Sequence, residues 1–359
     1  MTSEGFRNLA VALLLSPLAL ICACHATTGS RLEGTPVAIQ VPLGLPPVTL
    51  ARENYPTANS IALGRQLFYD TMLSKDNSVS CASCHRPELG FKDARERSTG
   101  VGGAKGRRHA PTLVNAVYSS LLFWDGRARG LETQADGPIT DPLEMNQTHE
   151  ALAARLKSDP RYKALFQSAF GSDDVTMERI ATALAVFERM MLSGNSAFDR
   201  YKYQGRKDAL SAAQIRGLAI FTDPQKGNCS ACHTIGPDYA LFTDGDFHNT
   251  GEGVGPDGEF TDEGRFEVTK HESDKGAFKT PTLRDVAVSG PYMHDGKLKT
   301  LKDVVDFYAG KGNSNPYLDK RMSAIQLSGR DRSDLVEFMK SLTGEMPSDL
   351  GPPGKDMYK

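Results

Sequence analysis

Residues 81–85 of this 359-residue chain read Cys-Ala-Ser-Cys-His, and the pattern returns at residues 229–233 as Cys-Ser-Ala-Cys-His. Two thiols at this spacing form thioethers to the haem vinyl groups, and the adjacent histidine binds the iron. A single Cys-x-x-Cys also fits a redox dithiol or half of a zinc site, but zinc needs two such pairs close together. We therefore predict two covalently bound haem c groups. Their attachment residues are Cys81, Cys84, His85, Cys229, Cys232 and His233.

The sequence after each of these segments follows the same order. Residues 111–113 and 281–283 both read Pro-Thr-Leu, and an Asp-Gly pair follows 14 residues after the proline in both places. A leucine then begins an apolar stripe at residues 131 and 301, again without a gap. A repeat of this kind indicates a duplicated structural unit. We predict two cytochrome-c-like haem domains related by internal duplication.

Helical patterns fill the segments between these motifs. Ser211 and Gln214 form a capping box before an apolar run. Residues 150–170 indicate a helix–turn–helix around Asp159-Pro160, and residues 331–342 indicate a C-terminal helix. Two helical stripes comprise Ile180, Ala183, Leu184, Phe187 and Met191, and Leu301, Val304, Val305 and Tyr308. Strand signals are few, so we predict a mainly α fold with long loops around the cofactors.

Composition and the N-terminus indicate an exported globular protein. Hydrophobic residues make up 39% and charged residues 24%, and the net charge of −2 argues against a nucleic-acid partner. Arg7 precedes an apolar run over residues 9–24, which is typical of a signal peptide. The run ends at Cys24 in a pattern that resembles the lipobox of bacterial lipoproteins. Cys24-His25-Ala26 also fits an ordinary cleavage site, so a periplasmic protein and an outer-membrane lipoprotein anchored at Cys24 are the alternatives.

The predicted domain boundaries follow from the two haem motifs and the composition around them. Residues 1–24 are the signal segment, and residues 25–58, rich in Pro, Thr and Gly, are a tether or an N-terminal arm. Residues 59–205 form the first haem domain and residues 206–345 the second. The remaining residues, 346–359, form a tail.

The repeat also locates candidates for the second axial ligand of each iron, which separates electron transfer from chemistry. Tyr308 lies 14 residues after His294, and Pro138 lies 14 residues after Trp124 at the matching position of the first repeat. A tyrosine oxygen can close the second iron, whereas proline offers no ligand atom and leaves the first iron open to a peroxide. The rival ligands for the second iron are Met293 and Met322.

Two further residues of the first repeat carry alternative readings. Glu144 follows Pro138 by six residues and could move a proton between the two oxygens of a bound peroxide. Its ordinary interpretation is a surface or capping glutamate. Trp124 is the only tryptophan in the chain and holds the place of His294. It either packs in an aromatic turn, as tryptophan usually does, or relays electrons between the haems.

The two haem segments, together with residues 107–145 and 280–308, resemble the bacterial di-haem cytochrome c peroxidase and MauG family. The resemblance covers about residues 50–345. It implies that hydrogen peroxide reacts at the N-terminal haem and that the C-terminal haem delivers or shares electrons. It also implies a tryptophan between the haems and a calcium ion between the domains.

The resemblance assigns roles to individual positions of this chain. His85 and His233 correspond to the proximal ligands, and Trp124 to the tryptophan between the haems. Gln134 and Glu144 correspond to the pair in the peroxide pocket, with Glu144 as the acid–base group. At the position of Tyr308 ordinary peroxidases carry methionine and the MauG branch carries tyrosine, so the chain is similar to the MauG branch.

Two departures from the family pattern bear on function. The loop over residues 98–108 lacks the histidine that caps the first iron in ordinary peroxidases until they are reduced. This difference implies an open site that needs no reductive activation. His109 stands at the place of the usual calcium-binding asparagine, and calcium prefers oxygen ligands. The other implied calcium ligands are the carbonyls of Ser289 and Pro291.

From these observations we predict a periplasmic di-haem peroxidase with an open first haem and a second haem closed by Tyr308. Its electrons would come from a donor protein such as a small cytochrome c or a cupredoxin, or from a protein substrate that it oxidises. The alternative is a di-haem electron-transfer cytochrome without peroxidase chemistry. That alternative predicts a sixth ligand on both irons.

Overall fold

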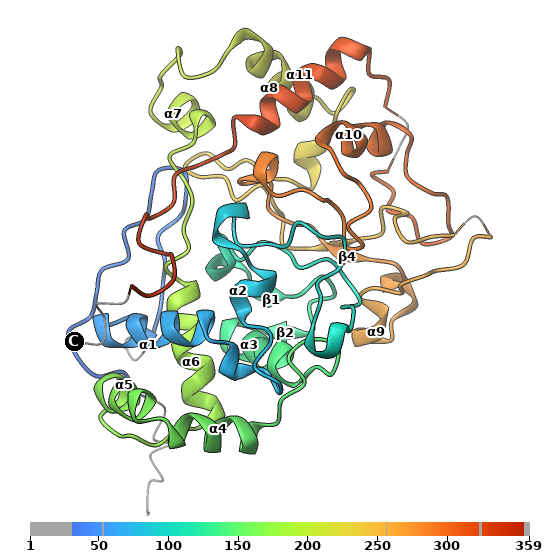
Figure 1. Ribbon diagram of the computed structural model, residues 1–359. Helices are drawn as coiled ribbons and strands as arrows, with labels where there is room; N and C mark the ends of the chain where they lie inside the picture. Colours follow the sequence, from blue (N-terminus) through green and yellow to red (C-terminus); the bar gives the residue numbers. More distant parts are fainter. Residues whose placement is uncertain (1–30, 52–53, 256, 323–324, 355–359) are drawn as a thin grey trace, which may run out of the picture.

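The computed structural model describes residues 31–51, 54–255, 257–322 and 325–354 (Figure 1). The predicted signal segment with Cys24, the first residues of the arm and residues 355–359 lie outside this part of the chain. The helices are α1 (Ala58–Tyr69), α2 (Cys81–Cys84), α3 (Leu131–Thr140), α4 (His149–Ser158), α5 (Pro160–Phe170), α6 (Met177–Glu188), α7 (Ala197–Tyr203), α8 (Ala212–Thr222), α9 (Phe266–Thr269), α10 (Leu301–Ala309) and α11 (Gly329–Lys340).

Sheet structure is sparse, and the predicted mainly α fold is confirmed. Among the described residues β1 (Leu121–Leu122) pairs antiparallel with β2 (Ala128–Arg129), and β3 (Phe247–His248) with β4 (Phe278–Lys279). None of the described helices is long and apolar enough to span a bilayer.

Helices α5 and α8 begin where the sequence predicts, whereas α11 covers Gly329–Lys340 instead of the predicted residues 331–342. Ser211 and Gln214 form the expected capping box of α8, and Asp159 caps α5 with Pro160 in its first turn. The predicted helix containing Met191 is too long, because α6 ends at Glu188. Met191 is nevertheless fully buried, and its carbonyl accepts a hydrogen bond from the Asn115 N–H at 2.9 Å. This long-range hydrogen bond takes the place of the one that a further turn of α6 would have supplied.

Two pairs of crossing helices form the cores of the two halves, and both crossings depend on a glycine. In the first half α1 meets α6 at Gly64, where an added Cβ would lie 2.8 Å from the carbonyl carbon of Ala183. In the second half α8 meets α11 at Gly217, where the Cβ would lie 2.7 Å from the carbonyl carbon of Asp334. Any side chain at either glycine would push the two helices apart.

Aromatic side chains fill the space beneath each crossing. Phe68 packs edge-to-face on Phe187 in the first half, with ring centroids 5.3 Å apart. Phe221 and Phe338 lie 5.0 Å apart in the second half. All four rings are 2% exposed or less, and burying each contributes about 1.5–3 kcal/mol.

Residues 31–51 of the N-terminal arm cross both halves (Figure 1, dark blue). The Gly44 carbonyl accepts hydrogen bonds from the Ala240 N–H at 3.1 Å and from the Arg284 guanidinium at 2.6 Å, both in the second half. The Pro46 carbonyl accepts one from the Tyr118 hydroxyl at 2.8 Å, in the first half. The arm therefore ties the halves together through its backbone.

A buried ion pair anchors this arm. The Arg284 guanidinium makes two 2.9 Å hydrogen bonds to the carboxylate of Asp199, and the two side chains are 1% and 0% exposed. Removing one partner of such a pair costs about 3–5 kcal/mol. At the chain's other end Leu350 joins the core of the first half, and its carbonyl accepts a hydrogen bond from Tyr69 at 2.7 Å.

Candidate functional site

The first cavity of interest lies beside α2 and spans about 610 Å³ of space between atoms, part of which is open to solvent. Helix α2 brings both cysteines to it, α3 and the turn after it bring polar side chains, and α6 closes another wall. Its lining includes Cys81, Cys84, His85, Gln134, Pro138, Leu184, Glu144 and Glu188. The structure thus places the first attachment motif and the predicted peroxide-pocket residues around one cavity.

Both motif histidines are held in the same way. The Nδ1 atom of His85 lies 3.1 Å from the Phe91 carbonyl, and that of His233 lies 2.9 Å from the Phe242 carbonyl. Because a carbonyl only accepts, Nδ1 carries the hydrogen, and Nε2 is left as a free electron-pair donor. Burial lowers the pKa of both imidazoles, which keeps them neutral. A neutral imidazole with a fixed tautomer is the form that binds a metal.

The two phenylalanines that supply these carbonyls have an unusual backbone. Phe91 has φ 55° and Phe242 has φ 52°, in the left-handed region that bulky residues rarely adopt. Both side chains are buried, at 1% and 0% exposed, so core packing holds the strained conformation. Neither phenylalanine could be identified from the sequence, because any residue type can supply a backbone carbonyl.

Glu144 lies in the turn that follows α3, and backbone contacts fix it there. Its carbonyl accepts a hydrogen bond from the Val101 N–H at 2.8 Å. A Cβ at Gly100 would lie 2.5 Å from the same carbonyl oxygen, so only glycine allows this approach. The loop without a capping histidine therefore packs on Glu144. Burial, and then the charge of Asp141, raises the pKa of Glu144 to about 7.

A second cavity, of about 1030 Å³, lies beside the other attachment motif. Cys229, Cys232 and His233 line it, and α10 brings in Tyr308. Met293 and Met322, the rival ligands, line the same cavity, so all three candidates lie within the second site. Pro138 lines the first cavity and Tyr308 the second, as their matched positions in the repeat predict.

Burial raises the pKa of the Tyr308 phenol well above its usual range. An unassisted Tyr308 therefore stays protonated at any physiological pH. Only a nearby metal cation would favour its phenolate, since a bound cation reverses the effect of burial. Its ring packs edge-to-face on Phe307, with centroids 5.4 Å apart.

Trp124 stands between the two cavities. It lines the second cavity together with His233 and Tyr308. It also lines a larger cavity of about 1550 Å³ that contains His85, Gln134 and Glu144. Its indole N–H donates to the His109 carbonyl at 2.8 Å, and its ring meets the edge of His294 at 6.5 Å between centroids. One aromatic side chain thus borders both sites.

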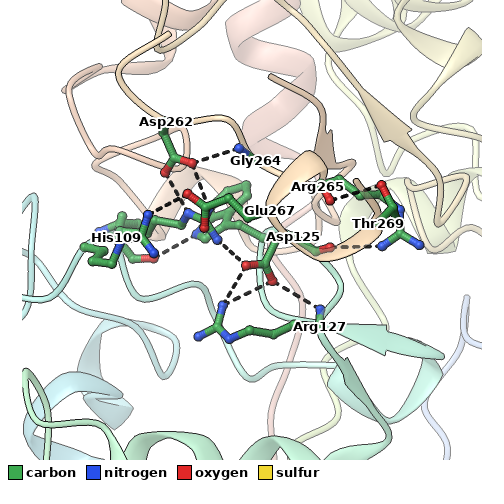
Figure 2. Close-up of polar contacts among 11 residues, drawn as sticks. His109, Asp125, Arg127, Asp262, Gly264, Arg265, Glu267 and Thr269 are labelled. Atoms are coloured by element: carbon green, nitrogen blue, oxygen red, sulfur yellow. Dashed lines mark hydrogen bonds and ion pairs between the residues drawn. The ribbon is translucent and has the colours of Figure 1, made fainter. Parts of the chain in front are cut away.

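An ionic network at Asp125, the residue that follows Trp124, joins the halves (Figure 2). Arg108 donates two 2.7 Å hydrogen bonds to Asp262 of the second half and one of 2.5 Å to Asp125 of the first. Arg265 donates to the Asp125 carbonyl at 2.9 Å. The Arg108 side chain is only 9% exposed, so this ionic network is buried and holds the two halves together next to Trp124.

The residues implied for calcium lie outside both attachment cavities. Ser289 donates its hydroxyl to the Val286 carbonyl at 3.3 Å, and Pro291 is buried. The His109 ring is occupied as well, because its Nδ1 lies 3.1 Å from the Arg95 carbonyl. The carbonyls of Ser289 and Pro291 stay predicted calcium ligands, and His109, which stands at the place of the usual calcium-binding asparagine, has its ring hydrogen-bonded to the Arg95 carbonyl.

Sequence reasoning missed two charged residues at the cavities. Glu188 is 4% exposed and lines the first cavity, and one of its carboxyl oxygens has no hydrogen-bond partner. Burial raises its pKa to about 8. The comparison of the two helix crossings points to Glu188. Phe187 packs at the first crossing as Phe338 does at the second, so Glu188 stands where the second half has the apolar residue Met339. The other missed residue is Lys279, which lines the second cavity.

Comparisons with known proteins identify the relatives of this arrangement. Residues 58–208 match the family model described as di-haem cytochrome c peroxidase. The chain is 41% identical over 290 residues to the methylamine utilization protein MauG of Methylorubrum extorquens, covering 80% of this chain and 79% of that protein. The chain belongs to the di-haem cytochrome c peroxidase and MauG family.

Other members of the family are similar along nearly the whole chain. The cytochrome-c peroxidase IdrP1 of Denitromonas iodatirespirans is 36% identical over 359 aligned positions, which cover 92% of this chain and 93% of that protein. A crystal structure of a MauG-like protein associated with microbial copper homeostasis superposes with a TM-score of 0.78 at 30% identity, covering 88% of this chain and 98% of that one. Proteins of this family are oxidoreductases that carry haem c.

The residues of this family member fit haem c at both cavities. None of the four motif cysteines forms a disulfide, and burial raises the pKa of Cys229 to about 12. Each cavity presents two thiols and one imidazole nitrogen from a single short segment. The second cavity also presents the ammonium of Lys279, which suits the carboxylates that a haem carries.

Proposed function

We propose that this protein reduces hydrogen peroxide at the first cavity and draws the electrons through the second. One observation carries the proposal. At matched positions of the two halves, the first cavity offers Pro138 where the second offers Tyr308, and the first also presents a carboxyl with a pKa of about 7. One site is built to admit a ligand and move its proton, and the other is built to be closed.

Haem c, when bound at His85, would supply the iron that exchanges electrons with peroxide. The chain's own residues would handle binding and protons. A carboxylate at Glu144 accepts the peroxide's proton and returns it to the far oxygen, so that water can leave. The Gln134 amide, on the preceding helix, can hold either oxygen, since an amide both donates and accepts. A proline at position 138 keeps this side of the cavity free of competing ligands.

At the second site His233 and Tyr308 would hold the haem iron. An anionic phenolate stabilises oxidised iron better than a thioether does, which favours Tyr308 over Met293 and Met322 where oxidising equivalents are held. Trp124, bordering both cavities, is the proposed path between them. The electrons would come from a donor protein such as a small cytochrome c or a cupredoxin, or from a protein substrate oxidised at the surface.

Three further features belong to this proposal. The like-built helix crossings and the paired strained phenylalanines support an origin of the two halves by internal duplication. A calcium ion held with the carbonyls of Ser289 and Pro291 remains an expectation from the family. The apolar N-terminal run supports export to the periplasm, with a lipid anchor at Cys24 as one form of it.

Electron paramagnetic resonance of the ferric holoprotein, combined with peroxide titration, tests the function. We expect one high-spin and one low-spin signal, with loss of the high-spin signal as peroxide is added. Two low-spin signals and no consumption of peroxide would instead establish a plain electron carrier. Tyr308→Phe should alter only the low-spin signal, and Tyr317→Phe, which changes a tyrosine outside both cavities, should leave both signals unchanged.

A further inference from the structure

Lys279 is a cation that lines the second cavity. It lies in β4, and its backbone N–H donates to the Trp124 carbonyl at 2.8 Å. Its side chain lines the second cavity with His233 and Tyr308, and also a neighbouring cavity bordered by Pro111 and Trp124. Strand pairing with β3 and the bond to Trp124 fix its position from both sides.

The Lys279 ammonium has no hydrogen bond or ion pair among the residues that the structure describes. The other cations at this cavity are paired: Arg321 lies 3.1 Å from Asp319, and His248 lies 2.9 Å from Asp244. Burial lowers the pKa of Lys279, and no nearby carboxylate opposes that effect. A partly buried cation without an anion is costly, so a negative group bound beside Lys279 in the second cavity would be stabilised.

Carboxyl groups of the protein itself cannot serve, because those lining the cavity are already engaged. Glu252 interacts with Asp295, and Asp319 with Arg321. We propose that the ammonium of Lys279 binds a propionate carboxylate of the haem in the second cavity. The inference rests on the proposed function only in placing a haem at His233.

The matching position of the first half carries no lysine or arginine. The residue two positions before its Pro-Thr-Leu segment is His109, and Lys279 stands two positions before the second. Burial lowers the pKa of His109 to about 4, so its imidazole is neutral. The two haems therefore differ in charge environment as well as in axial ligand. A cation beside the second haem favours its reduced form and raises its reduction potential.

Spectroelectrochemical titration of the holoprotein tests this assignment, with the first haem as an internal reference. In Lys279→Gln we expect the second haem's potential to fall while the first haem's stays at the wild-type value. Lys279→Arg, which keeps the charge, should restore it. Lys275→Gln is the matched control, because Lys275 pairs with Glu263 at 3.3 Å and lines neither attachment cavity.

An unchanged second potential in Lys279→Gln would overturn the inference. If Lys279→Gln fails to retain haem, Lys279→Arg carries the test, and a lowered second potential there would equally overturn it. These outcomes are distinct from failure of the proposed function. That failure would appear in the wild-type protein as two low-spin signals, or as no haem at His233, whatever the lysine does.

Discussion

Glu144→Gln removes the group proposed to move the peroxide's proton while keeping the size and polarity of the side chain. With a pKa of about 7, the Glu144 carboxyl is about one-half ionised at pH 7 and about one-tenth ionised at pH 6. Only the ionised form can accept a proton. The rate constant for peroxide should therefore rise about tenfold from pH 5 to pH 6 and level off above pH 7.

The magnitude of the loss follows from the role. Removing a general acid–base group costs about 10²- to 10⁴-fold in rate, so Glu144→Gln should react that much more slowly at pH 8. Its profile should also be flat, because no titrating group remains. Stopped-flow mixing of the holoprotein with excess hydrogen peroxide, followed in the haem absorption band, gives the rate constant at each pH.

Glu150→Gln is the control, since Glu150 is exposed on α4 and outside both attachment cavities. It should match the wild type at every pH. A Glu144→Gln variant with the wild-type rate and the wild-type pH profile would refute the reasoning, because the carboxyl would then have no part in the proton transfer. A slow variant whose profile still bends near pH 7 would assign the titration to another group.

Three further expectations concern stability, each measured by thermal or denaturant unfolding. Gly64→Ala should destabilise by about 1–3 kcal/mol through overpacking, whereas Gly329→Ala, whose added methyl meets nothing within 4 Å, should not. Glu188→Gln should raise the unfolding free energy at pH 7 by about 3 kcal/mol. Because native Glu188 holds its proton up to about pH 8, the stability of the wild type falls as the pH rises from about 5 to about 8. The stability of the variant should not fall over this range. Arg108→Met should lower the unfolding free energy by about 3–5 kcal/mol, because it leaves Asp262 without its cation. A loss no larger than that caused by replacing an exposed arginine would contradict the role of Arg108 in a buried ionic network.

The sequence was most informative where chemistry needs particular residue types at fixed spacing. The two attachment motifs, the caps of α5 and α8 and the stripe of α10 could all be predicted. The matched positions also led to Pro138 and Tyr308, which line corresponding cavities. In each case a short segment contains the whole signal, because neighbouring residues provide both the pattern and its partner.

The rest depends on partners far apart in the chain. The carbonyls that orient His85 and His233 belong to Phe91 and Phe242, and any residue could supply a carbonyl. Lys279 is one of many lysines until β4 places it beside Trp124. Helix α6 stops at Glu188 because Asn115 takes a backbone partner in the turn that follows. Such events are tertiary, and local sequence does not encode them.

The arm over residues 31–51 has a consequence for the order of assembly. A chain is made from its N-terminus, so Gly44 exists long before Ala240 and Arg284, whose hydrogen bonds it accepts. Until those partners emerge, the arm has nothing in the second half to hold. The contacts of this early-synthesised segment with the second half can therefore form only after that half has folded. Docking of the arm on the second half is thus a late step of folding. A chain truncated before Arg284 should lack the hydrogen bond between Arg284 and the Gly44 carbonyl.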